Sequence, residues 1–215
     1  MRTLVLLVAK DLRLEWRTRE ITTAVGLLAF LLVVVLGAAR SDRASAPAAM
    51  WVTYAFAATL GFTRTLALER DHATALRLAP VDGGVIFLAK TLANWLLLVA
   101  VQVISLPAFG ALFTEAAWTR LWPLVLPVVL GGVGLAAAGT LFGGLLVQTR
   151  LREAMLPLLM LPVTLPLLIA AVSATAAILD GAPVSAVRAQ LQLMGAFDIL
   201  VLTASWLLFE FVLEE

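Results

Sequence analysis

Long runs of residues without a single charge dominate this chain and restrict what it can fold into. Five such runs meet or approach the roughly 20 apolar residues that an α-helix needs to cross a bilayer, and a sixth is interrupted only by Asp198 and Glu210. Charged residues make up 13% of the chain and hydrophobic residues 62%, which leaves too little polar surface to cover a water-soluble globule. We therefore expect an all-α membrane protein that forms a single transmembrane domain over residues 1–215. Its six spans are predicted near residues 21–39, 45–63, 88–113, 121–147, 154–179 and 189–213.

The positions of the basic residues predict how these spans are oriented. Of the 15 Lys and Arg residues, 11 fall on one side of the predicted spans: Arg2, Lys10, Arg13, Arg17, Arg19, Arg64, Arg70, Arg77, Lys90, Arg150 and Arg152. The remaining 4 fall on the other side: Arg40, Arg43, Arg120 and Arg188. Because Lys and Arg accumulate in cytoplasmic loops, we expect both termini in the cytoplasm. A net charge of +1 gives no reason to expect a nucleic-acid partner.

The first 20 residues are predicted to form an amphipathic helix on the cytoplasmic leaflet. Apolar residues recur there near helical spacing, at Leu4, Leu7, Val8, Leu12 and Trp16, with Lys10, Arg13 and Arg17 opposite them. Such a helix lies in the bilayer interface rather than across it. Arg13, Trp16 and Arg17 are the predicted interfacial residues, and the alternative is a frayed cytoplasmic start.

Residues 64–84 form the longest predicted cytoplasmic connection. Asp71 can cap a short helix by accepting its exposed amide hydrogens, and Pro80 can end that helix. A short charged helix held between two spans is a suitable handle for a cytoplasmic partner. The residues predicted to couple to such a partner are Glu69, Arg70, Asp71, Arg77 and Pro80.

Glycine and proline mark two of the predicted spans. Gly139 and Gly143 form a Gly-xxx-Gly pair in the fourth span, which allows another helix to approach closely. Pro157, Pro162 and Pro166 should kink or break the fifth span, because each removes a backbone donor and strains the preceding turn. The fifth span is then either a kinked packing helix or a mobile, cavity-lining one.

Chemically reactive clusters are not evident in the sequence. There is no cysteine, and the lone histidine, His72, cannot form a metal site by itself, so we expect no metal and no catalytic residue. No phosphate-binding loop motif occurs, so ATP would be bound by another subunit. Lys90 is expected to extend its amine to the interface, and Asn94 to bond across helices. Asp198 is interpreted as an interfacial cap, with an ionisable group inside the membrane as the alternative.

Three stretches of the chain carry a likeness to a known family. They are the charged segment Lys10–Glu20, the stretch from Leu68-Glu69-Arg70-Asp71 through Ala75–Pro80 to Lys90, and the tail Leu208–Glu215. Together with the length and the six-helix layout, they resemble haem exporter protein B, the permease-like subunit of the cytochrome c maturation ABC complex. The resemblance implies an ABC exporter permease-like fold in a bacterial cytoplasmic (inner) membrane.

The resemblance also implies partners and a role. The partners would be a cytoplasmic ABC ATPase subunit, a haem-handling membrane subunit, a small single-span subunit and a periplasmic haem chaperone. ATP hydrolysis on the partner would drive haem export or release of the haem-loaded chaperone, while this chain binds no cofactor and does not ligate haem itself. Two other functions stay open: a non-transporting assembly scaffold, and an ABC exporter permease for a lipid, peptide or drug.

Overall fold

The computed structural model describes residues 2–18, 20–39, 45–70, 82–114, 116–146 and 152–214. Helices are the only regular structure in these ranges, which confirms the all-α class. They are α1 (Arg2–Thr18), α2 (Glu20–Ala39), α3 (Ala46–Arg70), α5 (Gly83–Leu112), α6 (Ala116–Thr119), α7 (Leu121–Leu146), α8 (Arg152–Leu179), the 3-10 helix η1 (Val184–Val187) and α9 (Arg188–Glu214).

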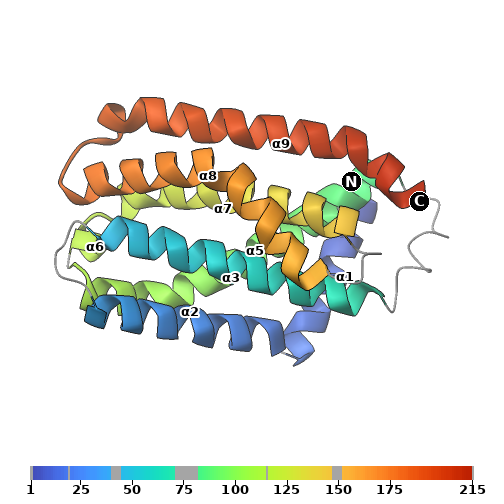
Figure 1. Cartoon of the computed structure of the whole chain (residues 1–215), viewed down its shortest axis with the longest axis horizontal. Helices are drawn as coiled ribbons and strands as arrows, with labels where there is room; N and C mark the ends of the chain where they lie inside the picture. The colour runs from blue at the N-terminus through green and yellow to red at the C-terminus, as the bar shows by residue number, and fades with distance from the viewer. Residues whose placement is uncertain are drawn as a thin grey trace.

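The long helices run side by side along one axis and alternate in direction (Figure 1). Helix α1 lies across one end of this bundle, where α3 ends, α5 begins and α9 ends (Figure 1). We call this the α1 end. The opposite end, which we call the α6 end, holds α6 and the short turn that leads into α9.

Five stretches of helix in the described part of the chain are long and apolar enough to cross a membrane. They are Thr22–Ala39, Gly83–Leu112, Leu121–Leu146, Ala154–Leu179 and Val184–Phe209. The last of these corresponds to the span that the sequence interrupts with Asp198. The apolar part of α3, Ala46–Phe62, is shorter, although the helix continues to Arg70.

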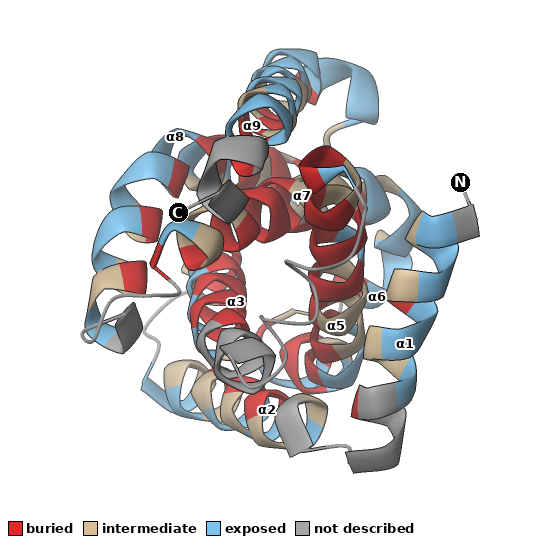
Figure 2. Ribbon diagram, turned by 90° about the vertical axis from the view of Figure 1, so that its right-hand side faces the viewer, coloured by how far each residue is buried: buried red, intermediate tan, exposed pale blue. Residues whose placement is uncertain are grey.

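Helix α7 is packed by α3, α5, α8 and α9. Buried residues face the inside, while the outer faces of α2, α8 and α9 carry exposed positions (Figure 2). Many of those exposed positions are large and apolar, such as Leu27, Ile169 and Leu207. An apolar outer surface of this kind suits a lipid environment rather than water.

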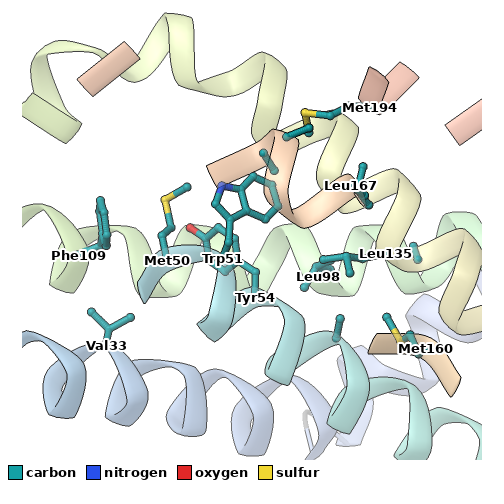
Figure 3. Close-up of a cluster of buried hydrophobic side chains, with 14 of the residues drawn as sticks. Val33, Met50, Trp51, Tyr54, Leu98, Phe109, Leu135, Met160, Leu167 and Met194 are labelled. Carbon is teal, nitrogen blue, oxygen red and sulfur yellow. The ribbon is translucent and has the colours of Figure 1, made fainter. Parts of the chain in front are cut away.

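Aromatic rings fill spaces left by glycines along α7. The indole of Trp51 on α3 lies against Gly131, and the ring of Phe62, three turns further along α3, lies against Gly139. Gly139 belongs to the Gly-xxx-Gly pair, and here it accommodates a side chain rather than a second backbone. Trp51 also packs edge-on against Tyr54 in the central apolar cluster, with ring centroids 5.7 Å apart (Figure 3).

Helix α8 is continuous through Pro157, Pro162 and Pro166, so the sequence-based alternative of a broken helix is wrong. The helix changes direction part-way along its length instead (Figure 1). The buried hydroxyl of Thr164 donates to the carbonyl of Met160 at 3.0 Å, a back-bond that also favours bending. A groove of ≈ 340 Å³ lies between the bent α8 and α3, lined by residues such as Leu165 and Phe56.

Candidate functional site

The α1 end gathers the helix termini that flank the predicted docking segment. Helix α3 ends there at Arg70 and α5 begins there at Gly83. The carboxylate of Asp82 caps α5 by accepting the amide hydrogen of Gly84 at 2.7 Å. Gly84 in turn lies against the indole of Trp206 on α9, with no room for a Cβ. The first turn of α5 is therefore held by both a cap and a neighbouring helix.

Helix α1 is attached to the bundle by packing and by charge. Val8 is buried, and Leu7 packs against the cluster that contains Ile86, Phe87 and Phe209. The carboxylate of Asp11 accepts a hydrogen bond from the ammonium of Lys90 on α5 at 2.8 Å. The apolar stripe of α1 therefore faces other helices of the protein, not lipid alone.

A second polar contact joins the far end of α1 to α2. The carboxylate of Glu15 accepts the backbone amide hydrogen of Thr22 at 2.7 Å, and Glu15 is buried. Thr22 lies in the first turn of α2, where backbone amides lack a helical partner. Glu15 thus acts as a cap supplied by the preceding helix.

Lys90 differs from the sequence-based expectation. Its amine was expected to extend to the interface, but the side chain is 7% exposed and bonds to Asp11. The sequence did carry a signal for this pair, because Asp11 and Glu15 lie at the same helical spacing as Leu4, Leu7 and Val8. Acidic residues in the middle of an apolar stripe indicate a buried polar partner.

The outer face of α1 combines exposed apolar and basic residues. Val5 and Leu6 are 61% and 63% exposed, and Lys10 and Arg13 are exposed on the same helix. Trp16 and Arg17, the other predicted interfacial residues, lie in the last turns of α1, and their side chains are outside the described part. This face is suited to a lipid headgroup region.

The predicted coupling residues are only partly described. Glu69 and Arg70 belong to the last turn of α3, and their side chains are outside the described part. Asp71, Arg77 and Pro80 lie outside the described residues altogether, as does the helix predicted for that segment.

Polar side chains also line the interface between α5 and α7. The Asn94 side chain donates to the hydroxyl of Thr140 at 2.9 Å, which confirms the expected bond across helices. The indole nitrogen of Trp95 and the amide nitrogen of Gln102 are buried, have no partner among the described residues, and both lie next to Gly132. Polar groups at such an interface hold membrane helices together.

Asp198 is not an interfacial cap, contrary to the preferred interpretation of the sequence. Helix α9 already begins at Arg188, so Asp198 lies almost three turns inside it. The residue is 5% exposed, and its carboxylate oxygens have no hydrogen-bond partner among the described residues. It faces Gly134 on α7, where a Cβ would come within 2.5 Å of the carboxylate. The alternative, an ionisable group inside the bundle, is the arrangement observed.

Groups that could bind a metal ion are not clustered in the described part of the chain, where no set of three His, Cys, Asp or Glu residues occurs. His72 lies outside it. The methionines with the greatest burial, Met50, Met160 and Met194, belong to the central apolar cluster. The thioether sulfur of Met160 also accepts a hydrogen bond from the Thr59 hydroxyl at 3.9 Å, as expected of a packing residue.

These features define the class of the protein: a multi-pass helical membrane protein with a polar attachment site at its α1 end. The family model described as CcmB protein matches residues 2–212, nearly the whole chain. The chain therefore belongs to the CcmB family, that of haem exporter protein B. No curated protein matches the sequence significantly. Family membership points to a permease component of the haem exporter in the cytochrome c maturation system.

Proposed function

We propose that this chain is the membrane permease subunit of an ABC transporter complex for cytochrome c biogenesis. ATP hydrolysis by a partner subunit would drive haem export or release of a haem-loaded chaperone. The observation that carries this proposal is the CcmB family match over residues 2–212. The proposed location is a bacterial cytoplasmic membrane, with the α1 end and both termini in the cytoplasm.

We propose six membrane crossings, which are the five candidate spans and, in addition, α3. Helix α3 has 25 residues and so extends about 37 Å, more than the roughly 30 Å of a hydrocarbon core. Its apolar part, Ala46–Phe62, packs beside α2, α7 and α8, and its remaining turns carry Arg64 and Arg70 toward the α1 end. Such a helix can cross the bilayer and end among lipid headgroups.

The distribution of basic residues supports the proposed orientation. Basic positions on described helices near the α1 end include Lys10, Arg13, Lys90 and Arg152, whereas Arg120 and Arg188 lie at the α6 end. Arg120 donates to the carbonyl of Gly181 at 3.2 Å, so part of its role is to join the loops of that end. The basic α1 end is the one expected to face the cytoplasm.

ATP hydrolysis would be coupled to movement of the helices through the segment that joins α3 to α5. An ATPase bound to Glu69, Arg70, Asp71, Arg77 and Pro80 would push on the last turn of α3 and the first turn of α5. Because Asp82 caps α5 and Gly84 packs tightly on Trp206, that first turn would move as a unit with α9. The docking surface is thus proposed to act on three helices at once.

Haem is proposed as cargo of the complex rather than as a ligand of this chain. Axial ligands for haem iron are usually His, Cys, Met or Tyr. Met160 and Met194 are fully buried in the apolar core, so iron could reach them only if the core opened, and Tyr54 and Met50 are buried at the wall of an apolar pocket of ≈ 210 Å³. A haem-handling subunit and a small single-span subunit would complete the membrane part, and a chaperone would receive haem outside.

Charge reversal in the proposed docking segment tests this function. We expect R77E to lower the amount of ATPase that co-purifies with the tagged chain by ten-fold or more, because an acidic side chain repels an acidic acceptor on the motor. Covalent cytochrome c in cells should fall with it, while the amount of inserted protein stays the same. R188E, at the α6 end, is the matched control and should leave both unchanged. ATPase recovery with R77E equal to that with R188E would contradict the docking role.

A further inference from the structure

The contact between Asp11 and Lys90 joins α1 to α5 close to the proposed docking segment. We infer that these two residues form a positioning pair, which makes α1 move together with the start of α5 when the ATPase acts. The inference rests on the proposed function and adds to it a named pair through which movement at the docking segment reaches α1 and α2.

The local environment gives this pair its importance. The Lys90 side chain is 7% exposed and the Asp11 side chain 18%, so water competes weakly for either group. At 2.8 Å the contact is a charge-assisted hydrogen bond, which fixes direction as well as distance. Apolar packing, in contrast, is not directional, so Leu7 and Val8 alone would let α1 rotate or slide on α5. The charged pair therefore fixes the register between the two helices.

The position of the pair connects it to the docking segment. Lys90 lies seven residues after Gly83, the first residue of α5, a distance of about 10 Å along the helix. A displacement of the first turn of α5 therefore reaches Lys90 within two turns. The contact of Lys90 with Asp11 passes this displacement to α1. The contact of Glu15 with Thr22 then passes it to the first turn of α2. Helix α2, which also packs directly on α3 and α5, is thus joined to α1 and α5 by two polar contacts as well.

Lys10 provides a matched control within the same helix. Its ammonium lies 3.4 Å from the other oxygen of Asp11, and its side chain is 46% exposed. Neutralising Lys10 removes a positive charge next to Asp11 but leaves the connection between α1 and α5 in place. Exposed pairs of this kind contribute little to stability.

The first experiment measures the placement of α1 directly. The chain contains no cysteine, so A9C on α1 and T119C on α6 can carry two spin labels without other substitutions. In the whole complex, we expect D11N and K90Q each to broaden the distribution of label distances at least two-fold. K10Q should leave the width unchanged, and the charge swap D11K/K90D should restore it toward that of the parent. Distance distributions of equal width in D11N, K90Q and K10Q would overturn the role of the pair in attaching α1 to α5.

The second experiment tests the role in coupling. We expect D11N and K90Q to lower covalent cytochrome c at least five-fold while ATP hydrolysis by the purified complex continues, and the swap to recover at least half of the loss. A merely stabilising pair would lower the amount of complex without changing the product formed per ATP hydrolysed. Normal yield per ATP in D11N would overturn the coupling role. If R77E still loses the ATPase, the proposed function stands even when D11N has a normal yield per ATP. Failure of the coupling role can therefore be distinguished from failure of the proposed function.

Discussion

The indole of Trp51 shows how single side chains determine the packing of this bundle. Its ring fills the space beside Gly131 on α7, and its nitrogen donates to the hydroxyl of Thr175 on α8 at 2.9 Å. Both Trp51 and Thr175 are buried. One residue of α3 therefore determines its distance from α7 and its register with α8.

Replacing Thr175 by Val tests this hydrogen bond. T175V keeps the shape of the side chain but leaves the indole N–H of Trp51 without its partner, so we expect a loss of about 1–2 kcal/mol in the stability of the detergent-solubilised protein. S173A, an exposed position on the same helix, is the control. A thermal-unfolding series should show a lower Tm for T175V alone, and equal Tm values would show that the bond contributes nothing.

Residue types on the helix faces could be predicted from sequence, but partners could not. The bond from Asn94 was expected, and its acceptor, Thr140, follows only from the structure. Lys90 was expected at the interface because hydropathy places it at the start of a span, whereas its partner Asp11 is 79 residues earlier in the chain. Asp198 was misplaced although its span was predicted to begin near residue 189, because the sequence does not show that its carboxylate faces Gly134 on α7.

At the scale of elements, α8 is the helix whose shape depends most on its sequence. Pro157, Pro162 and Pro166 each remove a helical hydrogen bond, yet the helix continues through all three. Its bend leaves the groove of ≈ 340 Å³ beside α3, a feature that a straight helix would alter. The bend is therefore either required for transport or merely tolerated by the packing.

Replacing the three prolines of α8 by alanine separates these possibilities. The triple variant restores three backbone donors, so we expect its Tm to equal or exceed that of the parent. If the bend is part of transport, covalent cytochrome c should fall at least five-fold although the protein is inserted normally. Full cytochrome c yield together with an unchanged Tm would show that the bend has no role in export. ATPase recovery with the triple variant should stay at the parent value, which serves as the internal control.

The sequence predicts the bounds of some membrane spans more closely than those of others. Four predicted spans coincide with candidate spans because long apolar runs can form only helices in lipid. The predicted span near 189–213 is shifted toward the N-terminus in Val184–Phe209 because η1 adds a turn before α9. The apolar part of α3 is shorter, since charge and polarity return after Phe62 while the helix itself continues.

At the scale of the whole molecule, the two ends of the bundle have different compositions. The α1 end carries α1, its polar contacts with α5 and α2, and the helix termini on either side of the docking segment. The α6 end carries short turns joined by the contact of Arg120 with Gly181. Among the residues that the structure describes, the polar contacts that attach α1 to α5 and α2 lie at the α1 end, where we propose that the motor acts.

The central claim, that the α1 end faces the cytoplasmic motor, is tested most directly by labelling single cysteines. The chain has none of its own, so R77C and R188C can be compared with a membrane-impermeant maleimide in inverted and right-side-out vesicles. We predict that R77C reacts only in inverted vesicles and R188C only in right-side-out ones. Reaction of R77C in right-side-out vesicles would contradict it, because the ATPase could not then reach the docking segment.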